Sequence, residues 1–201
     1  MTRQIIAILR GIRPEEVSEI GRELIAAGIG MIEVPLNSPA PFDSIARLAM
    51  EYSDRAQIGA GTVLTTEDVA KVKAAGGRLV VSPDANPEVI RATKAAGMAS
   101  FPGVMTPTEC FAALRAGADG LKFFPASLVG PDGLKAVLAV LPKGTACYAV
   151  GGAGPDNFAV WRAAGAAGFG IGTALYRPGL TAAEVRAGAD RIVAAYDKAM
   201  T

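Results

Sequence analysis

The feature that most constrains the fold is a recurring pair of elements, a short apolar run followed by a helical segment. Eight runs rich in apolar and β-branched residues predict strands at residues 5–9, 31–34, 57–60, 79–81, 99–101, 120–124, 146–150 and 168–171. Five of the segments between them end in an Ala-Gly pair, which is typical of the position just past a helix, with glycine at residues 28, 76, 97, 117 and 165. The sequence therefore predicts one βα unit repeated along the chain.

Eight βα units with apolar strands indicate a parallel sheet covered by helices, and eight such units close into a (β/α)8 or TIM barrel. The 201 residues are few for this barrel, so we expect short helices and loops and a single domain over residues 1–201. An open, doubly wound α/β sheet is the alternative, because the number of strands is uncertain from one sequence.

Charge and hydropathy limit the partners. The 20 basic and 19 acidic residues give a net charge of +1, so no broad field attracts nucleic acid or an anionic membrane surface. The apolar run in the opening segment MTRQIIAILRGI is too short for a signal peptide. No later run reaches the roughly 20 apolar residues of a membrane span. We expect a cytoplasmic protein that binds a small molecule, with Cys110 and Cys147 as core residues without a disulfide.

The chain contains no histidine. Proton transfer must therefore use carboxylates, lysine, tyrosine or water, and the commonest ligand of a catalytic transition metal is missing. We expect no metal and no cofactor, although an oxygen-ligated magnesium ion stays compatible with the composition.

Three charged residues stand on or just after predicted strands. Arg10 follows the first strand, Glu33 lies in the second and Lys122 in the sixth. Because side chains alternate along a strand, Glu33 and Lys122 are predicted to point into the barrel. Partial desolvation there lowers the pKa of a lysine, as an amine nucleophile requires. A buried ion-pair cluster of the three residues is the alternative reading.

Glycines mark the ends of the last two strands. Gly151 and Gly152 follow the seventh strand, and Gly172 and Thr173 follow the eighth. Glycine lets backbone N–H groups approach an anion, and phosphate binds most often beside these two strands of a barrel. Thr62, after the third strand, is predicted either to bind a substrate carboxylate or to cap the next helix.

At these residues the chain resembles the 2-keto-3-deoxy-6-phosphogluconate and 2-keto-3-deoxy-6-phosphogalactonate aldolases. The resemblance is carried, in order, by IAILRGI, IEVPLNSP, IGAGTVL, FPGVMTPTE, LKFFPAS, AVGGAGPDNF and GIGTALYRPG. It implies a homotrimer in which Lys122 forms a Schiff base and Glu33 is the general acid/base. It further implies keto-acid binding by Arg10 and Thr62 and phosphate binding by Gly151, Gly152, Gly172 and Thr173. Thr173 stands where the family often has serine, which keeps the hydroxyl.

The implied reaction splits a phosphorylated six-carbon keto sugar acid into pyruvate and glyceraldehyde 3-phosphate. A phosphosugar isomerase or epimerase without a covalent imine, and a phosphosugar-binding sensor, are the alternatives.

The branch of the family is predicted from residues that differ between its members. Asn37 replaces an arginine and Val150 a threonine of gluconate-type enzymes, and with Trp161 this pattern resembles the galactonate type. Val150 is then a substrate contact, unless it is ordinary β-branched strand packing. The gluconate compound stays the alternative substrate.

Overall fold

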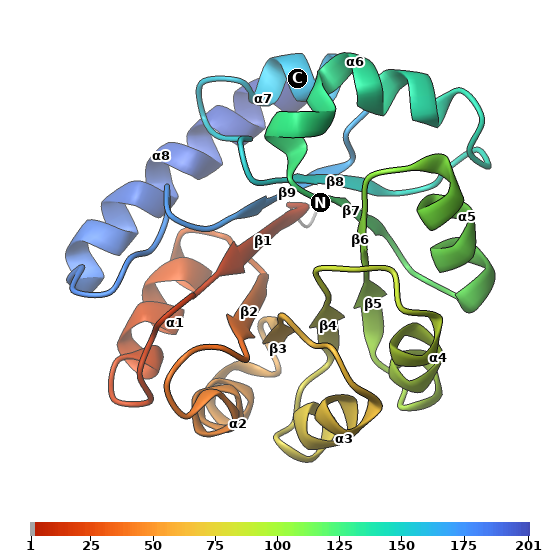
Figure 1. Ribbon diagram of the computed structural model, residues 1–201. Helices are drawn as coiled ribbons and strands as arrows, with labels where there is room; N and C mark the ends of the chain where they lie inside the picture. The colour runs from red at the N-terminus through yellow and green to blue at the C-terminus, as the bar shows by residue number, and fades with distance from the viewer. Residues whose placement is uncertain (1–2) are drawn as a thin grey trace.

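The computed structural model describes residues 3–201, so Met1 and Thr2 of the opening segment lie outside the described residues. Strands and helices alternate along the chain (Figure 1). The strands are β1 (Ile5–Ile8), β2 (Met31–Pro35), β3 (Gln57–Gly61), β4 (Leu79–Val81), β5 (Ala99–Phe101), β6 (Gly103–Val104), β7 (Leu121–Phe123), β8 (Cys147–Val150) and β9 (Gly168–Ile171). The helices are α1 (Val17–Ala26), α2 (Pro41–Tyr52), α3 (Thr66–Ala74), α4 (Pro87–Ala95), α5 (Pro107–Ala116), α6 (Ala126–Leu138), α7 (Phe158–Ala163) and α8 (Ala182–Met200).

All strand pairs are parallel, in the order β5-β4-β3-β2-β1-β9-β8-β7-β6. Pro102 separates β5 from β6, because proline offers no backbone N–H to a ladder. Segment 99–104 nevertheless pairs with β4 on one side and β7 on the other, and Lys122 N donates to Pro102 O at 2.9 Å. β5 and β6 together occupy one strand position of the barrel, so the nine strands correspond to eight positions. The predicted eight-stranded barrel is confirmed, and the alternative of an open sheet is wrong.

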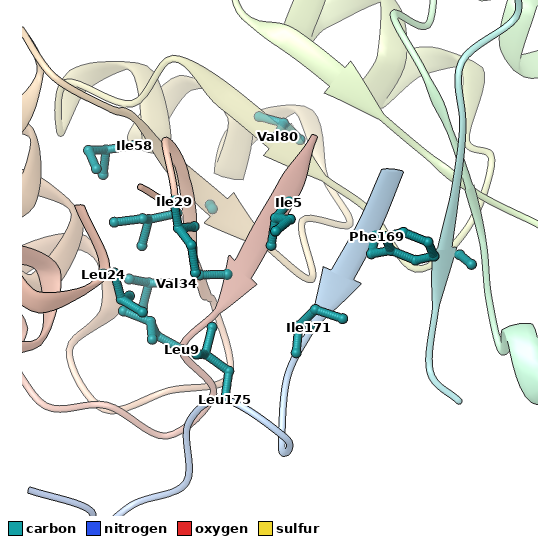
Figure 2. Packing of buried hydrophobic residues seen from close by; sticks show 14 of the residues in the cluster. Ile5, Leu9, Leu24, Ile29, Val34, Ile58, Val80, Phe169, Ile171 and Leu175 are labelled. Atoms are coloured by element: carbon teal, nitrogen blue, oxygen red, sulfur yellow. The ribbon is translucent and has the colours of Figure 1, made fainter. Parts of the chain in front are cut away.

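Helices ring the barrel in Figure 1, and the larger core lies between them and the outer face of the strands. On β1, Ile5 and Ala7 belong to this outer core, whereas Ile6 and Ile8 belong to a separate cluster inside the barrel. Figure 2 shows the outer packing around Ile5, where side chains from several strands and from α1 converge. The period of two therefore assigns each strand residue to the helix layer or to the barrel interior.

The predicted helix ends are also confirmed. The glycines at positions 28, 76, 97, 117 and 165 all have positive φ, between +70° and +102°. Both cysteines are free and buried, and Trp161 of α7 lies in the outer core. Among residues 3–201, no helix combines the length and apolar character needed to cross a bilayer.

Candidate active site

Among residues 3–201, Glu33 and Lys122 are the buried residues that carry a charged group. Glu33 lies on β2 and Lys122 on β7, and their side chains are 2% and 7% exposed. Their strand neighbours Ile32 and Leu121 face the helices instead. The predicted orientation of both charged residues is confirmed.

A small cavity of about 10 Å³ lies between strands at this level and is lined by Glu33 and Lys122. That volume is close to the space one water molecule requires. The rest of its lining is apolar or aromatic: Ile6, Ile8, Val81, Phe101, Tyr148, Val150 and Gly170. The two polar side chains therefore meet in a nearly dry setting.

Burial governs the ionisation of this pair. It raises the pKa of Glu33 to about 7, against the lowering effect of the charges on Lys122 and Arg10. Burial also lowers the pKa of Lys122, with Arg10 acting in the same direction and Glu33 opposing it. The site thus favours a neutral amine, the form that attacks a carbonyl.

No ion pair within 4.0 Å joins Arg10, Glu33 or Lys122 in the part of the chain that the structure describes. Glu33 Oε2 is buried without a hydrogen-bond partner. The Lys122 Nζ atom instead lies 4.5 Å from the centroid of the Phe124 ring. The buried ion-pair cluster is therefore not the arrangement found, and Phe124 is a site residue that the sequence interpretation missed, although it shares a strand face with Lys122.

Arg10 and Thr62 lie on loops after β1 and β3. Arg10 is exposed, and its Nη1 donates to Asn37 Oδ1 at 2.5 Å. Thr62 has φ +57°, a strained conformation for a β-branched residue and one that clusters at functional sites. The cap of α3 is Thr65, whose hydroxyl accepts from Asp68 N, so the helix-capping alternative for Thr62 is wrong.

The predicted phosphate residues share one larger cavity of about 210 Å³. Gly151, Gly152, Gly172 and Thr173 line it together with Arg10, Phe124 and Val150. Gly151 and Gly152 have φ of +79° and +105°, which only glycine adopts readily. Asn157 stabilises this loop: its Oδ1 accepts from Gly154 N and its Nδ2 donates to Gly152 O, both at 2.9 Å. No carboxylate lines the cavity, which suits an anion.

Val150 faces the interior and lines both cavities. Val150 therefore lies between Lys122 and the cavity lined by Gly151 and Gly152.

A further cavity of about 550 Å³ opens at the amino-terminal ends of the strands, lined by residues such as Gln57 and Arg78. It contains neither Glu33 nor Lys122, and the chemistry of such barrels lies at the carboxyl ends. Within residues 3–201 there is no cluster of three or more residues suited to hold a metal ion.

Fold and site together define a (β/α)8 barrel with a buried lysine and a buried carboxylate beside one interior cavity. Residues 1–192 match the model of the aldolase family described as KDPG and KHG aldolase, and the chain belongs to this family.

Three similar proteins extend this result. A probable 2-dehydro-3-deoxy-6-phosphogalactonate aldolase of Rhizobium meliloti is 51% identical over 98% of this chain and 93% of its own. A solved structure described as native KDPGal has 45% identity and a TM-score of 0.98, covering 100% of this chain and 97% of its own. KDPG aldolase from Legionella pneumophila, captured with pyruvate as a covalent carbinolamine intermediate, has 27% identity and a TM-score of 0.81, covering 97% and 93%.

Proposed function

We propose that this protein is a Schiff-base aldolase that cleaves 2-keto-3-deoxy-6-phosphogalactonate into pyruvate and glyceraldehyde 3-phosphate. The observation that carries the proposal is Lys122, buried, depressed in pKa and sharing a small cavity with Glu33. The names of the Rhizobium relative and of the native KDPGal structure support the substrate. The covalent pyruvate adduct of the Legionella enzyme supports the chemistry.

The proposed reaction begins when the neutral amine of Lys122 attacks C2 of the substrate. Loss of water from the carbinolamine gives an iminium ion, which is a sink for electrons. Glu33 as carboxylate takes the proton of the C4 hydroxyl, directly or through one water, while the C3–C4 bond breaks and its electron pair forms an enamine. Glyceraldehyde 3-phosphate leaves, Glu33 returns the proton to C3, and hydrolysis of the imine releases pyruvate and the free lysine.

In this proposal different residues bind the carboxylate and the phosphate, and Arg10 also borders the cavity lined by the phosphate residues. Arg10 and Thr62 bind the carboxylate of the keto acid, and Gly151, Gly152, Gly172 and Thr173 bind the phosphate, with Val150 between them. The neutral donors of the glycine loops and the absence of any carboxylate in the cavity wall support this division. No metal ion or cofactor takes part.

The assembly proposed for this enzyme is a homotrimer. Exposed apolar side chains at Leu64, Met105 and Leu128, on segments after β3, β6 and β7, offer surface for subunit contacts. Sedimentation equilibrium tests this point independently of activity. The cytoplasmic location stays a prediction of the sequence.

Borohydride trapping tests the function. Incubation with pyruvate and borohydride is expected to add a reduced pyruvyl group at Lys122, seen by peptide mass analysis. An adduct on another lysine, or none, overturns the assignment. Lys122→Met, an apolar chain of similar length, is expected to retain the fold and lose turnover.

The same experiments separate the other two candidates. An isomerase or epimerase would turn over a phosphosugar without a trappable imine, and a binding sensor would show no turnover. The gluconate epimer is distinguished by comparing the two substrates directly.

A further inference from the structure

The loops after β1 and β2 are joined by two side chains of the second loop. Asn37 Oδ1 accepts from Arg10 Nη1 at 2.5 Å, and Ser38 Oγ accepts from Gly11 N at 2.9 Å. The loop that provides these acceptors is itself held by its backbone. Leu36 N donates to Gly61 O at 2.8 Å, and Ser38 N donates to Pro35 O at 2.9 Å. The acceptor at position 37 is therefore attached to a well-bonded turn.

Arg10 depends on that acceptor for its orientation. It is an exposed, long side chain, and such a chain samples many rotamers unless a hydrogen bond fixes it. In the part of the chain that the structure describes, its guanidinium makes no other hydrogen bond and no ion pair. Its charge is nevertheless felt by both Glu33 and Lys122. Asn37 thus holds in place a guanidinium whose charge acts on both buried residues.

The chemical nature of the acceptor matters as well. An amide oxygen accepts a hydrogen bond without neutralising the guanidinium, whereas a carboxylate at the same position would pair with it. With a neutral partner, Arg10 presents its full charge and its remaining donors to an incoming carboxylate.

We propose that Asn37 is a positioning residue, which orients Arg10 for the carboxylate of the keto acid and, being neutral, leaves its charge available. This rests on the proposed function in one respect, namely that Arg10 binds the carboxylate. Asn37 is exposed, so its substitution leaves the core intact.

The test measures the half-saturating concentration of pyruvate for borohydride trapping, which reports the carboxylate end alone. Asn37→Ala is expected to raise this half-saturating pyruvate concentration about tenfold, because the substitution removes a hydrogen bond to a charged group. The maximal trapping rate is expected to stay nearly unchanged. In the aldol direction, the KM of glyceraldehyde 3-phosphate is expected to stay within about twofold of wild type, since the proposal assigns Arg10 to the carboxylate and the glycine loops to the phosphate. Asn37→Asp keeps an acceptor but adds a negative charge. It is expected to raise the half-saturating pyruvate concentration at least as much as Asn37→Ala does.

Two controls separate positioning from a general structural effect. Asn86 caps α4 by accepting from Glu88 N, so Asn86→Ala is expected to lower Tm without changing the pyruvate value. In an Arg10→Ala background, Asn37→Ala is expected to cause no further change in the half-saturating pyruvate concentration, because Asn37 acts through Arg10.

Three outcomes overturn the inference: an unchanged pyruvate value in Asn37→Ala, a wild-type value in Asn37→Asp, or full additivity of the two alanine substitutions. If the wild type traps no pyruvate at Lys122, the proposed function fails instead. Trapping in the wild type with no effect at position 37 refutes the positioning role alone.

Discussion

The carboxyl group of Glu33 lies so close to the α-carbon of Gly61 that a methyl group on residue 61 would overlap it. The two residues come from neighbouring strands, and both face the barrel interior. Gly61 therefore provides the space in which the proposed acid/base group stands.

Gly61→Ala is expected to displace the Glu33 carboxyl group and to lower kcat by at least 10²-fold, as roughly 1 Å of misplacement can. The backbone at Gly61 lacks a positive φ, so the effect is steric. Gly188 of α8 is the matched control, because a Cβ there would meet its nearest neighbour only at 3.8 Å. Steady-state kinetics of both variants check the point, and near-normal kcat in Gly61→Ala would contradict it.

Glu33→Gln keeps the shape of the side chain and removes its proton transfer. We expect kcat to fall on the order of 10² to 10⁴-fold, with most of the loss in the chemical step. Because the pKa of Glu33 is raised to about 7, the rate of the wild type is expected to rise as the pH increases through 7. The rate of the Glu33→Gln variant is expected not to show this rise. Single-turnover rates between pH 5.5 and 8.5 measure both effects, and an unchanged kcat would reassign the acid/base role.

Glu33 also links stability to pH. Its pKa in the folded protein, about 7, lies above the ordinary value of 4.5, so the folded state binds this proton more tightly than the unfolded state does. Its contribution to the free energy of unfolding is therefore complete below pH 4.5 and is lost as pH rises through 7. The loss is on the order of 3 kcal/mol, at about 1.4 kcal/mol per pKa unit.

The comparison is best made in a Lys122→Met background, which removes the coupled amine and its lowering effect on the pKa of Glu33. Urea unfolding of Lys122→Met with and without Glu33→Gln, at pH 5 and pH 8, gives the difference. The glutamine variant is expected to gain relative stability at pH 8. A pH-independent difference would mean that the carboxyl group is not desolvated.

Much of this arrangement was predictable because strand periodicity acts residue by residue. Lys122 between Leu121 and Phe123 must face opposite to its apolar neighbours, and so must Glu33 between Ile32 and Val34. These inferences need only the alternation of side chains.

Contacts between segments were not predictable in the same way. The closeness of Glu33 and Gly61 depends on the register of β2 against β3, and the bond from Arg10 to Asn37 depends on where two loops meet. A single sequence encodes neither directly. The break at Pro102 carried a signal in the proline itself, but how both halves stay in the barrel is a matter of tertiary packing.

Removal of metal ions is expected to leave activity intact. In the proposed mechanism Glu33 transfers the proton and Lys122 supplies the electron sink, so no Lewis acid is needed. The chain also lacks histidine, the commonest ligand of a catalytic transition metal. Prolonged dialysis against a chelator, followed by assay in chelator, makes the measurement. Activity that falls and then recovers with a divalent ion would refute the metal-free mechanism.

Val150 is expected to set the preference between the two C4 epimers. Val150 is 6% exposed and borders both the cavity at Lys122 and the cavity lined by Gly151 and Gly152. In the proposed binding mode it therefore faces the middle of the substrate.

Threonine at this position has nearly the same shape as valine but offers a hydroxyl that can bond to a substrate hydroxyl of one configuration. Valine leaves that substrate hydroxyl unpaired, at a cost of roughly 1 to 3 kcal/mol, or about 5- to 150-fold in kcat/KM. We expect the wild type to prefer 2-keto-3-deoxy-6-phosphogalactonate, and Val150→Thr to shift the ratio of kcat/KM toward the gluconate epimer. Both epimers are assayed on both proteins. An unchanged ratio would reduce Val150 to strand packing, and a wild-type preference for the gluconate compound would reverse the proposed substrate.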